Sequence, residues 1–274
     1  DTRLIEPVTI YNKFEAGESE AILVLSDWHY GIDYEGFANT FNPVICKERV
    51  KKLREEVIKI ITKEQVKHLH IFNLGDLISG NIHLPLRINA REDVISQTMH
   101  VAEILAEFIE DMTKIVPVTY SSCVDNHSRI NANKKESLQI ESFARFIDWH
   151  IINKMELTEN SKFIYNPNHM GDDIIDTYLC GKWKVLGVHG HLDSPSKALK
   201  DLTRYCCGAD MILSAHLHTF TAKEDLGTVL YTNPSLCSSD DYAHSLRLYN
   251  PPAQLLIIST PDCVDKCVYK IKLG

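Results

Sequence analysis

Short apolar runs alternate along the chain with longer segments in which apolar residues recur every three or four positions. The runs at 21–25, 68–74 and 115–122 are bounded by polar turn residues, which is typical of strands covered on both faces. Between them, Asn42 followed by Pro43 predicts a helix start, with Asn as N-cap and Pro in the first turn. The apolar spacing predicts a further helix over 91–112.

The second half of the chain is richer in strand-like segments. A helix is expected near 137–156, followed by a hairpin formed by DDIIDTYL and WKVLGV. The run DMILSA at 210–215 and the later runs TVLYT, AQLLIIS and VYKIK are also strand-like. Alternating strands and helices followed by a strand-only tail predict an α/β protein of two packed sheets with helices outside.

Each strong apolar strand stops at a short cluster of Asp, Asn or His. In chain order the clusters are Asp27-Trp28-His29, Gly75-Asp76, Asn126-His127, His189-Gly190-His191 and His216-Leu217-His218. Taken singly, each is compatible with ordinary turn or capping chemistry. Together they place oxygen and imidazole groups at strand ends, where sites assemble in layered α/β folds. These ligand types suit Mn, Fe or Zn rather than calcium.

Composition narrows the classes of protein that fit. With 44% hydrophobic and 24% charged residues, the 274-residue chain is typical of a soluble globular protein, and we expect one domain over 1–274 with an N-terminal arm at 1–20. The net charge of −8 argues against coating long duplexes by charge alone. No apolar run reaches membrane-span length, the first residues lack signal-peptide features, and eight cysteines contain no CxxC pair. We therefore expect a reduced, cytoplasmic protein without a membrane partner.

The order of the clusters along the chain resembles the motif order of a known family. D-x-H, G-D, N-H, H-G-H and A-H-x-H, spread over residues 27 to 218, resemble the calcineurin-like metallophosphoesterases, whose pattern is DxH, GDxxD, GNH[DE] and GHxH with an intervening histidine. The resemblance implies a four-layer α/β/β/α sandwich of two mixed β-sheets flanked by helices. It also implies two divalent metal ions at one edge, with Mn²⁺ expected and Fe or Zn as alternatives.

The resemblance also assigns roles to individual residues. Asp76 matches the carboxylate that bridges the two metals, and His127 matches a histidine that faces the phosphate and protonates the leaving oxygen. Two cations clamp a phosphodiester and lower the pKa of water toward about 7, while a histidine is suited to protonating an alkoxide. The implied metal ligands are Asp27, His29, Asp76, Asn126, His189, His216 and His218.

Four positions depart from the family pattern. Asp125 stands where the family has glycine before N-H, and Ser128 stands where it has an acid after N-H. Ser79 replaces the second acid of GDxxD, and Ala215 replaces the glycine of GHxH. None of these changes removes an expected ligand, but the partner that orients the catalytic histidine is missing from the sequence.

Details such as SDWHYG and NHSR resemble phage-encoded relatives of DNA-repair exonucleases, such as the nuclease subunit of the SbcCD complex. The expected function is phosphodiester hydrolysis, with DNA as substrate, a homodimer, and a separate ATPase as partner. The stretch 80–95 is apolar and basic, and is interpreted as a lid or docking segment. The expected substrate-binding residues are Arg129, Lys134, Lys135, Tyr242 and Arg247.

Three alternatives remain. HGHLDS matches all but the last histidine of the HxHxDH signature of metallo-β-lactamase-fold hydrolases, where this chain has Ser194. The same fold also serves phosphomonoesterases and phosphodiesterases for small or cyclic nucleotides. Finally, Asp125 and Ser128 could mark a catalytically weakened relative that acts as a metal-binding interaction subunit.

Overall fold

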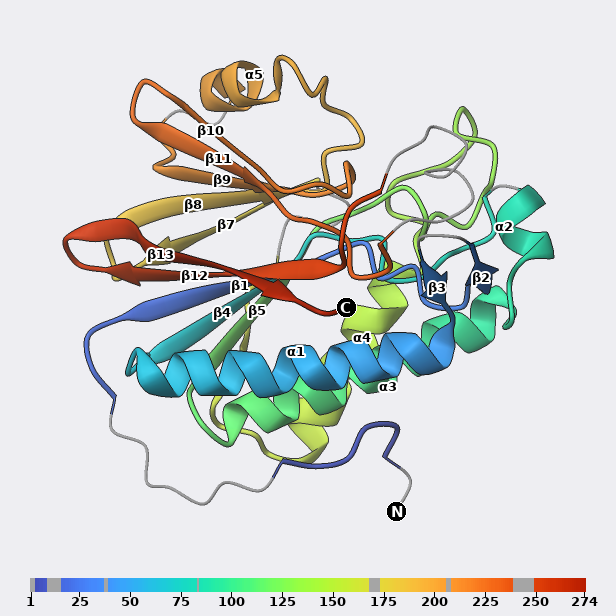
Figure 1. Cartoon of the computed structure of the whole chain (residues 1–274), viewed down its shortest axis with the longest axis horizontal. Helices are drawn as coiled ribbons and strands as arrows, with labels where there is room; N and C mark the ends of the chain where they lie inside the picture. Colours follow the sequence, from blue (N-terminus) through green and yellow to red (C-terminus); the bar gives the residue numbers. More distant parts are fainter. Residues whose placement is uncertain are drawn as a thin grey trace.

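The computed structural model describes residues 3–8, 16–36, 39–82, 84–167, 173–205, 208–238 and 249–274. These residues form two main sheets and helices on both outer sides (Figure 1). A short two-stranded sheet, β2 (Tyr34–Glu35) with β3 (Thr40–Phe41), adds to them. In the described part of the chain, no helix is long and apolar enough to cross a membrane.

The larger sheet has six strands in the order β13-β12-β1-β4-β5-β6. Strands β1, β4, β5 and β6 run parallel, and β12 and β13 are antiparallel to their neighbours. The bounds are β1 (Glu20–Leu25), β4 (His68–Asn73), β5 (Val118–Ser122), β6 (Phe163–Tyr165), β12 (Ala253–Thr260) and β13 (Cys263–Lys272).

The smaller sheet has five strands in the order β10-β11-β9-β8-β7. Strands β8, β9 and β11 run parallel, while β7 and β10 are antiparallel edge strands. The bounds are β7 (Ile174–Leu179), β8 (Trp183–Val188), β9 (Met211–Ser214), β10 (Thr221–Asp225) and β11 (Thr228–Thr232).

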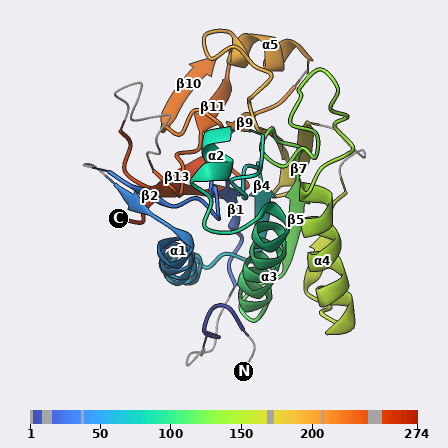
Figure 2. The same cartoon turned by 90° about the vertical axis from the view of Figure 1, so that its right-hand side faces the viewer.

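Three long helices cover the outer face of the larger sheet, and Figure 2 shows them side by side beneath it. They are α1 (Pro43–Lys63), α3 (Val94–Thr113) and α4 (Ala144–Leu157). Helix α5 (Ala198–Tyr205) lies over the smaller sheet, and the short α2 (Leu84–Ile88) lies at the right of Figure 1.

Alternation along β1 shows how the layers are built. Ala21, Leu23 and Leu25 pack against the long helices, whereas Ile22 and Val24 pack into a second cluster shared with the smaller sheet. Successive residues of a strand point to opposite faces, so a strand between two layers must be apolar throughout. A third cluster joins α5 to the outer face of the smaller sheet. The predicted four-layer α/β/β/α sandwich of two mixed sheets is therefore confirmed.

Helix starts follow the capping chemistry. Asn42 accepts from the backbone N–H groups of Val44 and Ile45, as predicted. The helix predicted over 91–112 begins at Val94, because the Asp93 side chain caps it. The helix expected near 137–156 begins only at Ala144, since turns occupy the residues before it.

Residues 3–8 of the N-terminal arm pack on the helix layer. Ile5 is buried in the main core, and the backbone N–H groups of Leu4 and Ile5 donate to Glu107. Arg3 and Arg54 both bind the buried carboxylate of Asp111.

Candidate metal centre

The parallel strands β1, β4, β5, β8 and β9 each end in one of the polar clusters, and the clusters meet at one edge of the sandwich. The backbone there turns sharply. Asp27, His29, Asp76, His216 and His218 all have positive φ, between 46° and 66°. Each such residue costs on the order of 1 kcal/mol, and strain of this kind concentrates at functional sites.

The first group of side chains comes from the turns after β1 and β9. The Nε2 atoms of His29 and His218 lie 3.2 Å apart, and His218 Nε2 lies 3.3 Å from Asp27 Oδ1. Asp27 is fully buried, and its Oδ2 accepts from the Ser26 hydroxyl. Its Oδ1 atom has no hydrogen-bond partner among the described residues.

The second group surrounds His189, which follows β8. Its Nδ1 donates to the Leu74 carbonyl at 2.7 Å, so Nε2 faces Asp76 Oδ2 at 3.1 Å and Asn126 Oδ1 at 2.9 Å. The ligand atoms of Asp76, His189 and His216 all lie within 4.8 Å of one another.

Asp76 belongs to both sides of the site. Besides its place beside His189 and His216, its carboxylate forms a group with His29 and His127 whose ligand atoms are also within 4.8 Å. Burial opposes ionisation of Asp76, yet the rings of His127 and His189 hold its pKa well below the ordinary value. The structure thus brings together all seven residues that the sequence predicts as ligands.

These groups fit divalent cations. The Nδ1–H of His189 is used by Leu74, so a neutral ring presents an Nε2 lone pair to two oxygen acceptors. Burial lowers the pKa of His189, but the Asp76 carboxylate overrides this and raises it to about 10. A cation held between His189 Nε2 and the oxygens of Asp76 and Asn126 would take the place of a proton on Nε2 and offset the repulsion between these acceptor atoms. The buried Oδ1 of Asp27, without a hydrogen-bond donor in the described chain, marks a second such place.

His127 is oriented by a backbone group rather than by an acid. Its Nδ1 donates to the Ser79 carbonyl at 2.7 Å, which leaves Nε2 to face the Asp76 side, 3.9 Å from Oδ2. Gly80, at φ 72°, passes so close to the His127 carbonyl that a β-carbon would collide with it. The missing acid at 128 therefore has a structural substitute in the 79–80 turn.

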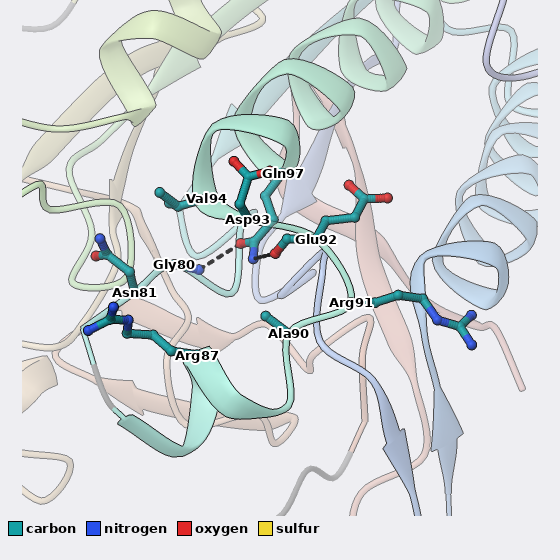
Figure 3. A pocket seen from close by; sticks show the side chains of 9 residues that line it. All are labelled: Gly80, Asn81, Arg87, Ala90, Arg91, Glu92, Asp93, Val94 and Gln97. Carbon is teal, nitrogen blue, oxygen red and sulfur yellow. Dashed lines mark hydrogen bonds between the residues drawn. The ribbon is translucent and has the colours of Figure 1, made fainter.

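The 79–80 turn is held by helix α3. Gln97 Oε1 accepts from the Gly80 N–H at 2.9 Å, and Gln97 Nε2 donates to the Glu92 carbonyl (Figure 3). The same residues border a cavity of about 390 Å³ that is also lined by Arg87 and Arg91. The segment expected at 80–95 as a lid or docking element thus lines a cavity next to the turn that orients His127.

Asp125 closes a local turn instead of pointing an anion at the solvent. Its two carboxylate oxygens accept from the Ser128 N–H and hydroxyl, at 2.6 and 2.9 Å. Burial and the neighbouring Asp76 carboxylate raise the pKa of Asp125 to about 6. Gly75, at φ 90°, packs directly on the Asp125 β-carbon, so the departures at 125 and 128 from the pattern that the sequence resembles compensate one another within one turn.

A sixth strand end, which was not predicted from the sequence, also reaches this edge. Strand β11 is parallel to β9 and leads to Asn233, whose Nδ2 donates to the Ser26 hydroxyl beside Asp27. Four residues later comes Cys237, whose sulfur lies within 4.8 Å of ring nitrogens of His29 and His218. In the sequence, TNPSLC follows an apolar run, but it holds no Asp or His and a lone cysteine forms no motif.

The basic candidates differ in their surroundings. Arg129 bonds the Ala132 carbonyl, whereas Lys134 and Lys135 are exposed. Burial, and after it the nearby His189 ring, lower the pKa of His191 to about 4, and the Lys134 charge adds a smaller effect in the same direction. Tyr242 and Arg247 lie outside the described residues.

Four histidines outside the clusters lie in the described part of the chain, and each has an ordinary partner. His68 bonds Thr119, while His70, His100 and His150 each face a glutamate. They are not part of the metal centre.

Comparison with known proteins gives distant likenesses. No family model matches the chain. It is 23% identical over 238 residues to the SPbeta prophage-derived uncharacterized protein YonJ of Bacillus subtilis (strain 168), covering 82% of this chain. The chain spans only 57% of the length of that relative.

Similar solved structures include a novel archaeal phosphodiesterase, at 13% identity and a TM-score of 0.45, with 92% of this chain and 99% of the other covered. They also include Vps29 of Entamoeba histolytica complexed with Zn²⁺, at 11% identity and a TM-score of 0.43, with 93% and 99% covered. Both TM-scores are below 0.5, so the layer arrangement rests on the chain's own sheets and helices.

Proposed function

We propose that this chain is a binuclear-metal-dependent phosphoesterase that hydrolyses phosphodiester bonds. The observation that carries the proposal is the shared carboxylate of Asp76, which lies within 4.8 Å of histidine nitrogens on both sides. One anionic group between two sets of imidazoles is what a pair of cations a few ångströms apart requires.

The residues divide into two ligand sets. Asp27, His29 and His218 would hold one cation. Asn126, His189 and His216 would hold the other, with Asp76 common to both. When bound, such a pair neutralises the phosphate and lowers the pKa of water, which supplies a nucleophile at neutral pH.

His127 supplies the proton for the leaving oxygen. Its Nδ1–H is committed to the Ser79 carbonyl, so Nε2, on the side of the Asp76 carboxylate, is the atom left to transfer a proton. A ring held at Nδ1 presents Nε2 in one direction, which suits protonation of an alkoxide, a poor leaving group without a proton.

DNA ends are the substrate class that we propose, with Mn²⁺ as the activating metal. The support is the exposed basic pair Lys134 and Lys135 in the segment that follows His127, where a flanking phosphate can be bound. On the basis of the sequence, we also propose that the chain is a cytoplasmic single-domain enzyme, that it forms a homodimer and that it acts with a separate ATPase.

The test is hydrolysis of bis-p-nitrophenyl phosphate and p-nitrophenyl phosphate with added Mn²⁺. Asp76→Asn keeps the size of the side chain and removes the shared charge, while Asp201→Asn changes an exposed carboxylate on α5. We expect diester turnover to fall at least about a thousandfold in Asp76→Asn and to stay unchanged in Asp201→Asn.

Three other outcomes would contradict the proposal in different ways. Equal diester turnover in the parent and Asp76→Asn would remove the shared carboxylate from the chemistry. Faster turnover of the monoester would favour the phosphomonoesterase alternative. Bound metal without turnover of either ester or of labelled DNA ends would favour the interaction subunit.

A further inference from the structure

The loop after β11 brings a thiol to the metal centre. Cys237 is 2% exposed, and its sulfur lies within 4.8 Å of ring nitrogens of both His29 and His218. Cys237 follows β11. Among the parallel strands that the structure describes in the smaller sheet, β11 alone leads to no residue of the ligand set given above.

An independent feature marks the same place as a cation position. Asp27 Oδ1 is fully buried and has no hydrogen-bond partner in the described chain, and it lies 3.3 Å from His218 Nε2 and 3.9 Å from His29 Nε2. The two Nε2 atoms face one another at 3.2 Å, so at most one of them donates. A carboxylate oxygen and two imidazole nitrogens therefore converge with too few protons to bond to one another. Such atoms are typical ligands of a divalent cation.

The backbone holds Cys237 at this place independently of its sulfur. The N–H groups of Leu236 and Cys237 both donate to the Asp27 carbonyl, at 3.1 and 3.3 Å. The Cys237 carbonyl accepts from Asn39 at 3.0 Å and from the buried guanidinium of Arg49 at 2.9 Å. The loop is therefore fixed to the Asp27 turn.

We propose that the Cys237 thiolate is a ligand of the cation held by Asp27, His29 and His218, and that it makes this position selective for a zinc-class ion. The inference rests on the proposed two-metal site. On binding, the thiol proton passes to solvent and the weak bond from Cys237 Sγ to the Ser238 carbonyl, at 3.3 Å, is given up. A sulfur donor favours Zn²⁺, Fe²⁺ or Co²⁺ over Mn²⁺.

The other cation position has a different donor set. Asp76, Asn126, His189 and His216 offer only oxygen and nitrogen. Such a set accepts Mn²⁺ readily. The two positions are thereby distinguished by one sulfur atom, so a mixed pair of ions is expected when both metals are supplied.

Titration of the metal-free protein with Co²⁺ tests the inference without an activity assay. Thiolate coordination gives a strong sulfur-to-cobalt charge-transfer absorption in the near ultraviolet, whereas cobalt bound by oxygen and nitrogen alone gives only weak visible bands. We expect the strong absorption in the parent and in Cys46→Ala, which removes a buried sulfur from α1, and its loss in Cys237→Ala and Cys237→Ser.

Affinity supplies a second measurement. Zn²⁺ binding to the first position should weaken about tenfold or more in Cys237→Ser, which keeps a donor for the Ser238 carbonyl, while Mn²⁺ affinity changes less than about threefold. Far-ultraviolet circular dichroism checks that the variants are folded.

The outcomes separate the two proposals. Weak visible cobalt bands without charge transfer in the parent would overturn the thiolate ligand and leave the metal centre intact. An unchanged charge-transfer band in folded Cys237→Ala would also overturn it. Absence of any cobalt binding to the parent would overturn both the thiolate ligand and the proposed function.

Discussion

Asp148 on α4 connects the helix layer to the strand ends that carry the candidate metal centre. Its carboxylate accepts from the hydroxyl groups of Tyr120 and Ser122, both on β5. Tyr120 in turn accepts from Asn73 Nδ2 at 3.0 Å, and Asn73 Oδ1 accepts from the N–H of Gly75, the residue before Asp76. A change at Asp148 therefore perturbs a chain of hydrogen bonds that reaches the site.

The perturbation is Asp148→Asn, and its magnitude follows from the carboxyl pKa. Burial raises that pKa from 3.8 to about 6, although the hydrogen bonds from Ser122 and Tyr120 oppose the shift. The difference of about 2 units corresponds to about 3 kcal/mol at the limit. Because the side chain keeps some contact with solvent, we take about 1 kcal/mol for the change between pH 8 and pH 5.

The direction is fixed by which state binds the proton. The folded state binds it more tightly, so the stabilisation is fully present below the unfolded pKa of 3.8 and is lost as pH rises through about 6. The amide that replaces the carboxyl group in the variant does not titrate. The parent should therefore gain stability over Asp148→Asn as pH falls, by about 2 °C in melting temperature for a chain of this length.

The assay is thermal unfolding followed by circular dichroism from pH 8 to pH 5, with EDTA present so that metal binding does not contribute. Asp201→Asn is the control, because Asp201 is an exposed carboxylate on α5. A parent-minus-variant difference that is flat across this range, or that shrinks toward pH 5, would refute the assigned pKa and its cause.

Three further predictions address the leaving group, the metals and the helix layer. His127→Gln should lower kcat about a hundredfold or more for diesters with alkyl leaving groups and much less for p-nitrophenyl esters, measured by steady-state kinetics, because p-nitrophenolate leaves without a proton. Mn²⁺ should raise the melting temperature of the parent and not that of Asp76→Asn, as measured by scanning fluorimetry. Asp111→Ala should lower the free energy of unfolding in urea by about 3–5 kcal/mol, since it removes the carboxylate that pairs with buried Arg54, whereas Lys59→Ala breaks an exposed pair and should cost less than about 1 kcal/mol.

The layers and the strand ends could be predicted because burial on both faces leaves a strong mark on the sequence. A strand such as 21–25 has to be apolar throughout, and the polar cluster that follows it is then conspicuous. Short edge elements leave no such mark. The β6 and β10 strands are partly exposed, and α5 is only eight residues long, so neither their pattern nor their composition distinguishes them from loops.

The site was predictable in its ionisable side chains and not in its backbone groups. Every residue has a carbonyl, so no sequence signal shows that Ser79 or Leu74 supplies the acceptor that fixes a histidine tautomer. Cys237 was missed for a different reason. A single cysteine after a five-residue strand has no motif, and only the parallel pairing of β11 with β9 brings it to the shared edge.

The departures from the metallophosphoesterase pattern that the sequence resembles acquire a different meaning once the backbone is considered. The loss of acids at 79 and 128 would disable a histidine that depended on a carboxylate for its orientation. In this chain the Ser79 carbonyl orients His127, and the Ser128 side chain and N–H instead satisfy Asp125. A carbonyl fixes the orientation of the His127 ring without adding a negative charge beside it. Serine at these positions is therefore compatible with a working proton donor, and motif loss alone does not argue for an inactive relative.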